Sequence, residues 1–199
     1  REEMNAEQRK FTRASTSPES REPPPENEQT VVKSDVVFKR SEEFNKRVAA
    51  FRYGSGGARI TYVELLDSHN QPIRNVEFDQ QVSVAICFET EIEEEISCIY
   101  YVADAKRNFV IGSGMDLPGY GYLKSRNNGR YTVIYKTRMP LKEGNYSIQL
   151  ELTKPLIFDQ TAEFLDVIDN AIVFNVSRRP HGRVWAQVYV PNSLYVIEG

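Results

Sequence analysis

Apolar residues alternate with small or polar ones most clearly near the middle of the chain, at Val82, Val84, Ile86 and Phe88. A period of two places these side chains on one face of an extended strand and their sequence neighbours on the other face. The pattern therefore predicts a half-buried β-strand whose apolar face packs against a core.

Similar short runs, rich in Val, Ile, Tyr, Phe and Thr, follow from residue 59 onward, and turn-forming residues separate them. Runs of this kind are typical of antiparallel strands joined by tight turns. About eight to ten strands suffice for two packed sheets, so the sequence predicts an all-β fold, an antiparallel β-sandwich. The further predicted strands cover residues 60–66, 96–103, 109–112, 130–136, 146–152, 171–176, 183–190 and 194–197.

The first part of the chain has a different composition. Residues 1–34 contain Pro18 and the run Pro23, Pro24 and Pro25 among charged and small polar residues, with few large apolar ones. Such a segment buries too little apolar surface to offset the entropy that ordering costs. We expect residues 1–50 to be a linker, largely disordered, in front of a β-sandwich domain over residues 51–199.

Two short helices interrupt this picture. Ser41 is a suitable N-cap because acidic residues follow it, and apolar residues recur on one face of the following turns. The sequence predicts a short helix near residues 41–51, within the linker. A second helical segment of one or two turns is expected near residues 159–168, where three apolar residues recur at every third position: Ala162, Leu165 and Ile168.

Composition and charge narrow the choice of partner. The 25 basic and 28 acidic residues give a formal charge of −3, which argues against a nucleic acid because such partners need a basic surface. Cys87 and Cys98 lie in apolar runs, which favours buried thiols over a disulfide or a zinc site. No segment has the pattern of a signal peptide or of a membrane span, so we expect a cytoplasmic location.

Catalytic patterns are weak. His69 and His181 are the only histidines, both lie in turn sequences, and no nucleophile motif accompanies them. The acids between residues 91 and 95 are typical of a solvated loop, although a pair of carboxylates for glycoside hydrolysis and a calcium site remain alternatives. The sequence predicts a protein that is not an enzyme and that needs no cofactor or metal.

Five short segments occur in a specific order along the chain, at residues 53–56 (YGSG), 63–67 (VELLD), 141–148 (LKEGNYSI), 169–176 (DNAIVFNV) and 182–184 (GRV). In this order they resemble the C-terminal domain of Wzt-type proteins, the ATP-binding subunits of ABC transporters that export O-antigen polysaccharide. The resemblance implies an immunoglobulin-like β-sandwich and a homodimer. It also implies recognition of the exported glycan at the cytoplasmic face of the bacterial inner membrane.

The sequence departs from such a subunit in one respect. It contains no Gly-x-x-x-x-Gly-Lys-Ser/Thr loop, whose backbone amides would cradle the phosphates of ATP. The glycine-rich residues 54–57 are followed by a predicted strand and by no nearby lysine, so we interpret them as an entry turn. The chain as given is not itself the ATPase.

A glycan site needs aromatic faces for the sugar rings and polar side chains for the hydroxyl groups. The chain has 11 tyrosines and one tryptophan, and Tyr120 and Tyr122 alternate with glycines in a segment too polar for a core strand. A loop that displays both rings is therefore predicted, although one ring could instead close the end of the sandwich, and Trp185 could belong to the core or to a dimer interface. The predicted glycan-binding residues are Tyr120, Tyr122, Lys124, Arg126, Asn127, Asn108 and Trp185.

The predicted function is non-catalytic recognition of the end of a lipid-linked O-antigen polysaccharide, with an ABC transporter membrane subunit as a partner of the parent protein. Arg126 would bind a phosphate on the terminal sugar. A short proline-containing hinge at residues 191–193 would allow the predicted strand 194–197 to exchange within a homodimer. A protein-interaction or dimerisation module without glycan contact, and a hydrolase, are the alternatives.

Overall fold

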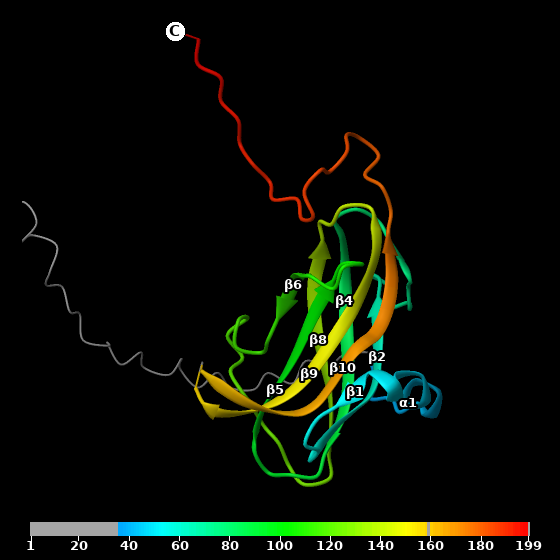
Figure 1. Ribbon diagram of the computed structural model, residues 1–199, viewed down its shortest axis with the longest axis vertical. Helices are drawn as coiled ribbons and strands as arrows, with labels where there is room; N and C mark the ends of the chain where they lie inside the picture. Colours follow the sequence, from blue (N-terminus) through cyan, green and yellow to red (C-terminus); the bar gives the residue numbers. More distant parts are fainter. Residues whose placement is uncertain (1–35, 159, 199) are drawn as a thin grey trace, which may run out of the picture.

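Two β-sheets packed face to face form the body of the chain (Figure 1). The computed structural model describes residues 36–158 and 160–198. Its larger sheet has the strand order β1-β10-β9-β5-β6, with β3 beside β10 and β7 beside β5, and its smaller sheet has the order β2-β4-β8. The strands are β1 (Arg52–Tyr53), β2 (Ala58–Leu66), β3 (Asn75–Val76), β4 (Gln80–Thr90), β5 (Glu95–Ala103), β6 (Phe109–Ser113), β7 (Leu123–Lys124), β8 (Gly129–Met139), β9 (Gly144–Ile157) and β10 (Thr161–Val176).

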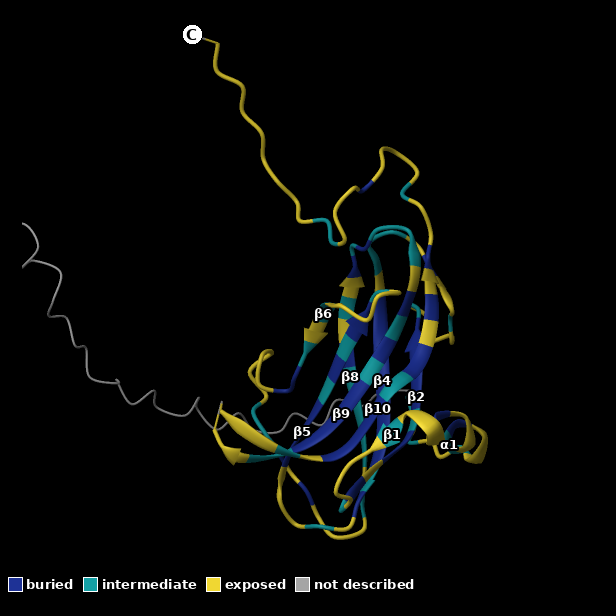
Figure 2. Cartoon of the chain, viewed as in Figure 1, coloured by how far each residue is buried: buried dark blue, intermediate teal, exposed yellow. Residues whose placement is uncertain are grey.

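The antiparallel β-sandwich predicted from the sequence is confirmed. Val82, Val84, Ile86 and Phe88 on β4 are each at most 1% exposed and lie within one core with the apolar residues of β2, β5, β9 and β10. The predicted strands from residue 60 to residue 152, and the one at 171–176, all lie within observed strands. Figure 2 shows the buried residues concentrated along the middle of the paired strands.

The predicted N-terminal helix is also present. The helix α1 (Glu42–Val48) begins after Ser41, whose Oγ accepts a hydrogen bond from the backbone N of Phe44 at 3.1 Å, and it continues into a 3₁₀ turn, η1 (Ala49–Phe51). Phe44 and Val48 are buried against the sandwich. Residues 1–35, which include most of the predicted linker, lie outside the described residues.

The helix predicted near residues 159–168 is wrong, because Thr161–Val176 form the long strand β10. β10 pairs with β9, and its register shifts at three places, between Thr161 and Ala162, between Phe164 and Asp166, and between Ile168 and Ile172. The first shift leaves Leu156 of β9 without a partner, and the other two leave extra residues on β10, as β-bulges do. The bulges break the period of two, and the remaining spacing of apolar residues resembled a helix.

The strands predicted at residues 183–190 and 194–197 are not formed within this chain. In the described part of that segment, only an isolated bridge from Val188 to Leu141 is present. The segment instead leaves the sandwich and extends away from it (Figure 1), and its apolar side chains Leu194, Tyr195, Val196 and Ile197 are all more than 80% exposed. Strand propensity was correct for an extended backbone, but no sheet edge of the same chain receives the segment.

A buried ion pair fixes β1 to the larger sheet. The guanidinium of Arg52 donates hydrogen bonds to both oxygens of Asp166, at 2.8 and 2.6 Å, and the backbone N of Ile60 donates to the same carboxylate at 2.7 Å. Both charged side chains are less than 10% exposed. Gly54 follows directly, and a Cβ there would lie 2.3 Å from the carbonyl oxygen of Leu165. These contacts hold β1 against β10 and thereby place Tyr53.

The structure also shows the state of the two cysteines and the length of the helices. Cys87 and Cys98 are buried free thiols, as predicted. The helices found within the described residues are too short and too polar to cross a lipid bilayer.

Candidate functional site

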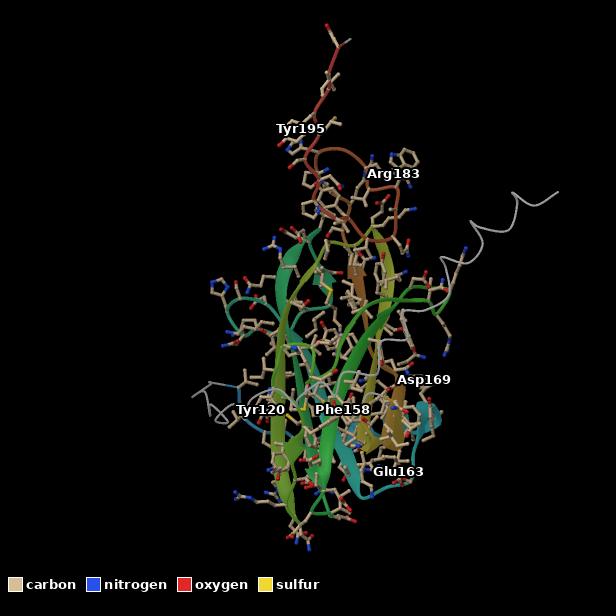
Figure 3. The ribbon with its side chains drawn as sticks, turned by 90° about the vertical axis from the view of Figure 1, so that its left-hand side faces the viewer. Tyr120, Phe158, Glu163, Asp169, Arg183 and Tyr195 are labelled. Atoms are coloured by element: carbon tan, nitrogen blue, oxygen red, sulfur yellow. The ribbon has the colours of Figure 1, made fainter. Side chains whose placement is uncertain are left out.

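The predicted glycan-binding residues lie at two ends of the sandwich. Lys124 pairs with Glu95 at the start of β5, whereas Asn108 follows the turn beyond Ala103 at the end of β5. Those two ends are about 26 Å apart for a strand of this length. In Figure 3, Tyr120 lies in the lower half of the view and Arg183 lies near the upper end. The Trp185 ring is 5.0 Å from the Arg183 guanidinium. The seven residues do not form one site.

The residues at the start of β5 include the two predicted loop tyrosines. Tyr120 is 40% exposed in the loop after β6, and Tyr122 packs edge to face against Phe158, with 6.0 Å between ring centroids. Arg126 and Asn127 belong to the tight turn before β8, where the backbone N of Gly129 donates to the carbonyl of Arg126 at 2.9 Å. The side chains of Arg126 and Asn127 are exposed at this end of the sandwich.

The two residues at the opposite end have separate roles. Asn108 donates from Nδ2 to Asp104 Oδ2 at 3.0 Å and so stabilises the β5–β6 turn. Trp185 is 78% exposed, with the Arg183 guanidinium 5.0 Å above its ring, and Arg183 pairs in turn with Glu143 at 3.1 Å. Trp185 therefore lies outside the core of this chain.

The sheet register brings together a different group of residues, on the outer face of the larger sheet. Ile99 on β5 lies opposite Glu151 on β9, Glu151 lies opposite Val167 on β10, and Val167 lies opposite Tyr53 on β1. The next row on β5 and β9 pairs Tyr101 with Gln149. We call this surface the outer face and define it by Tyr53, Tyr101, Phe109, Asp116, Gln149, Glu151 and Asp169.

An aromatic pair forms one part of the outer face. The rings of Tyr101 and Phe109 are stacked, with centroids 4.6 Å apart and planes at 16°. Tyr101 lies over Gly112 of the neighbouring strand, where a Cβ would approach its Cδ1 to 2.6 Å. The glycine thus leaves room for the tyrosine ring to lie across β6.

A pocket of about 440 Å³ opens beside this pair. Ile99 and Tyr101 of β5, the residues of β6, and the loop residues Asp116 and Leu117 line it. Tyr120 follows that loop, and its backbone N donates to the carbonyl of Met115 at 3.1 Å. Of the residues predicted from the sequence, the fold therefore places two next to the pocket: Tyr120, and Asn108, which directly precedes the lining residue Phe109.

The carboxylate of Glu151 is the least exposed acid of the outer face. Glu151 is 9% exposed, and its Oε1 accepts a hydrogen bond from Gln149 Nε2 at 2.9 Å. Burial and the negative charge of Asp169 raise the pKa of Glu151, although the hydrogen bond from Gln149 lowers it. Over residues 36–158 and 160–198, no donor to its Oε2 and no Lys or Arg partner is present.

The carboxylates of the outer face also affect the pKa values of its tyrosines. Burial, the charges of Asp169 and Glu151, and a hydrogen bond with Asp169 raise the pKa of Tyr53. Burial and the charges of Glu151 and Asp116 raise the pKa of Tyr101. The strand order β1-β10-β9-β5 places Glu151 on β9 between Tyr53 on β1 and Tyr101 on β5, and Asp116 lines the pocket together with Tyr101.

The groups on the outer face suit non-covalent binding of a ring that has an apolar C–H face and polar hydroxyl groups at its edge. Stacked aromatic rings suit the C–H face of a sugar, carboxylates accept from hydroxyl groups, and the amide of Gln149 both donates and accepts. Groups of three or more His, Cys, Asp or Glu side chains able to hold a metal ion are absent from the residues that the structure describes.

Sequence reasoning missed the outer face, although one signal for it was present. In the run from Ser147 to Thr153, polar residues alternate strictly with Ile148, Leu150 and Leu152. Such alternation predicts a strand with one polar face, and Gln149 and Glu151 lie on that face. The run alone did not reveal which strands lie beside it.

Comparisons with known proteins agree with this architecture. The family model described as the Wzt C-terminal domain matches residues 49–188. A crystal structure of the C-terminal domain of Wzt superposes with a TM-score of 0.66 and 15% sequence identity, covering 74% of this chain and 88% of that chain. A Pseudomonas fluorescens alkylpurine DNA glycosylase bound to DNA gives a TM-score of only 0.40, at 5% identity over 62% of this chain and 31% of that chain, which supports no inference. No curated protein matches the sequence.

Proposed function

Because the chain belongs to the Wzt C-terminal domain family, we propose that it is a non-catalytic domain that binds the end of an O-antigen polysaccharide for an ABC transporter. In this proposal the parent protein carries the ATPase and contacts the membrane subunit at the cytoplasmic side of the inner membrane. The domain selects the glycan and performs no chemistry on it.

The observation that carries the proposal is the pocket on the outer face. Its volume of about 440 Å³ falls within the range of small-molecule sites. The Tyr101 and Phe109 pair offers an aromatic surface, and Gln149 and Glu151 lie one strand away on β9. A sugar ring needs both kinds of group at this spacing, because its C–H face is apolar and its rim carries hydroxyl groups.

The loop residues predicted from the sequence extend the proposed site. Tyr120 lies next to the loop that borders the pocket, and Tyr122 continues the aromatic surface to Phe158 at the tip of the β9–β10 hairpin. Further sugar units of the polysaccharide would follow this direction. Lys124, Arg126 and Asn127 lie beyond it. On the other side of the pocket, Asn108 directly precedes the lining residue Phe109, and Trp185 lies outside the core at that end of the sandwich.

The first experiment measures glycan binding by the 199-residue chain. Polysaccharide pull-down and calorimetry are performed with wild type, Tyr101→Ala and Glu151→Gln. We expect Tyr101→Ala to weaken binding at least ten-fold because it removes the stacking ring. Glu151→Gln should weaken binding by a smaller factor, because the amide keeps an acceptor oxygen and loses only the charge of the carboxylate. Glu64→Gln is the matched control, since Glu64 is equally buried on the smaller sheet and pairs with Lys39. Equal binding by all four proteins would disprove the site.

Homodimerisation is the second part of the proposal. The segment with Leu194, Tyr195, Val196 and Ile197 exposes four consecutive apolar side chains and has no strand partner within the described part of its own chain. Exchange of this segment between two copies would cover it and pair its backbone. Truncation after Pro191 should give a monomer in analytical ultracentrifugation.

The same segment favours a second candidate function, a dimerisation module that does not touch the glycan. The two functions differ in a simple measurement. A chain that dimerises and retains no polysaccharide in pull-down supports the module, whereas retention that Tyr101→Ala abolishes supports the glycan-binding domain.

A further inference from the structure

The outer face combines acidic groups with an absence of basic partners. Glu151, Asp169 and Asp116 form no ion pair with any Lys or Arg of residues 36–158 and 160–198. Two of them, Glu151 and Asp116, act on the same ring, Tyr101, which lines the pocket. A ligand that stacks on Tyr101 in the pocket therefore has the carboxylate of Asp116 on one side and that of Glu151 on the other.

The basic residues of the same strands are committed elsewhere. Arg52 of β1 is held by Asp166 inside the sandwich. Lys154 of β9 pairs with Glu94 at 3.4 Å and with Glu163 at 3.8 Å, and it lies at an odd number of positions from Glu151, which places the two side chains on opposite faces of the strand. Neither residue is available to neutralise an anion on the outer face.

The predicted cations are also distant from the pocket. Lys124 lies beside Glu95, four residues along β5 from Ile99, which corresponds to about 13 Å. Arg126 lies beyond it in the turn before β8. An anionic group bound against Tyr101 would thus lie near carboxylates and out of reach of these two side chains. The cations nearest to the pocket are Lys106 and Arg107, which are exposed in the turn before Phe109.

A ligand without negative charge satisfies the same groups. The free Oε2 of Glu151 can accept a hydrogen bond from a sugar hydroxyl, because none of the described residues donates to it. Gln149 offers the remaining atoms of its amide to a neighbouring hydroxyl, and the Tyr101 and Phe109 rings cover the C–H face. The carboxylate and amide oxygens are then matched by hydroxyl donors of the ligand, and the remaining N–H of Gln149 is matched by a hydroxyl acceptor.

We propose that the sugar held in this pocket carries no phosphate and no carboxylate, and that Glu151 and Asp116 exclude anionic end groups. This inference rests on the proposed function, and it names the ligand class that the pocket selects. It differs from the prediction from sequence, in which Arg126 binds a phosphate on the terminal sugar.

Paired sugars test this selectivity. Binding of the 199-residue chain is measured by saturation-transfer NMR and calorimetry with a panel of neutral methyl pyranosides and with the uronic acid and 6-phosphate of each. We expect at least one neutral sugar to bind, and its anionic counterparts to bind at least ten-fold more weakly at pH 7 and low salt. An anionic member that binds as tightly as its neutral counterpart would overturn the inference and leave the proposed function standing.

Two substitutions assign the selectivity to the named carboxylates. In Glu151→Gln and Asp116→Asn combined, the neutral-to-anionic ratio should fall at least three-fold, because the repulsion is removed while hydrogen-bonding capacity is kept. Glu64→Gln, on the smaller sheet, should leave the ratio unchanged. An unchanged ratio in the double variant would disprove the role of the two acids. Binding of no sugar of either class would disprove the proposed function itself, and this inference with it.

Discussion

Two glutamates, one on each sheet, are almost equally buried and yet differ in their partners. Glu64 on β2 is 8% exposed, and both of its carboxylate oxygens accept hydrogen bonds from Lys39 Nζ at 2.8 Å. Glu151 on β9 is 9% exposed, and Gln149 is its one hydrogen-bond donor among the described residues. One carboxylate is neutralised within the fold, and the other is not.

The surroundings explain the difference. Residues 36–40 cross the outside of the smaller sheet, where the backbone N of Lys39 donates to Cys87 Sγ at 3.3 Å and Thr61 Oγ1 donates to the Lys39 carbonyl at 2.8 Å. No described segment covers Glu151 in this way. Among the described residues no buried side-chain oxygen lacks a hydrogen-bond partner, so Glu151 Oε2, which has no donor there, is open to solvent. The comparison separates an acid that is paired within the fold from one that the proposed function assigns to the ligand.

The strongest test of this comparison concerns an acid of the larger sheet that does have a cation. Arg52→Ala would leave the buried carboxylate of Asp166 without its ion pair, and we expect a loss of about 3–5 kcal/mol in the free energy of unfolding. Urea denaturation measures this loss. Arg59→Ala is the control, because Arg59 is exposed on β2. A loss below about 1 kcal/mol would mean that burial and pairing do not distinguish these acids.

The next prediction perturbs the open face without touching an acid. In Gly112→Ala the new Cβ would meet Tyr101 Cδ1 at 2.6 Å and the Tyr100 carbonyl oxygen at 3.0 Å. We expect the Tyr101 ring to be displaced, with a stability loss of about 1–3 kcal/mol and weaker sugar binding. Gly56→Ala meets no atom within 4 Å, but its φ of +91° strains an alanine, so it controls for a loss of stability that leaves the Tyr101 ring in place. Unchanged binding in Gly112→Ala would place the sugar away from Tyr101.

Replacing each of the two glutamates by glutamine tests the comparison directly. Glu151→Gln keeps the shape and removes an uncompensated charge, so the free energy of unfolding at pH 7 should rise by about 0.5–2 kcal/mol. Glu64→Gln breaks an ion pair with a partly exposed lysine, and the same free energy should fall by up to about 1 kcal/mol. Chemical denaturation at equal ionic strength measures both. Changes of the same sign in both variants would remove the distinction.

The smallest expected effect is a dependence on pH. The pKa of Glu151 is raised in the folded chain above its ordinary value of 4.5, so the folded state holds this proton more tightly than the unfolded state does. The stability that this proton contributes is complete below pH 4.5 and is lost as the pH rises through the folded pKa. Glu151→Gln should therefore gain stability relative to wild type across that pH range. A constant difference from pH 4 to pH 7 would contradict the raised pKa.

The sandwich itself could be predicted from local patterns. Residues 82–88 alternate without interruption, and β4 has no register shift against β8 over its whole length. In β10 the bulges move Leu165 and the residues after Ile168 out of step, so a period of two was not visible there. Strands could be recognised wherever their pairing was regular.

The outer face could not be predicted in the same way. Tyr53, Tyr101, Glu151 and Asp169 come from four strands that are far apart in the sequence, and only the order β1-β10-β9-β5 makes them neighbours. The predicted residues, by contrast, were mostly close in sequence, and one short segment that includes β7 joins Tyr120 to Asn127. Spacing along the chain indicates loops well, but sheet faces depend on long-range pairing.

The bulge between Ile168 and Ile172 has an evolutionary consequence. Before it, Asp166 points into the sandwich and supports the fold; within it, Asp169 reaches the face where Tyr53 lies. Because this irregularity absorbs extra residues, an insertion or deletion at 169–170, next to the buried Ala171, would alter the face where Tyr53 lies while the flanking pairs Ile168–Leu150 and Ile172–Ile148 stay in register. Related chains could diversify in specificity at this point without rebuilding their core.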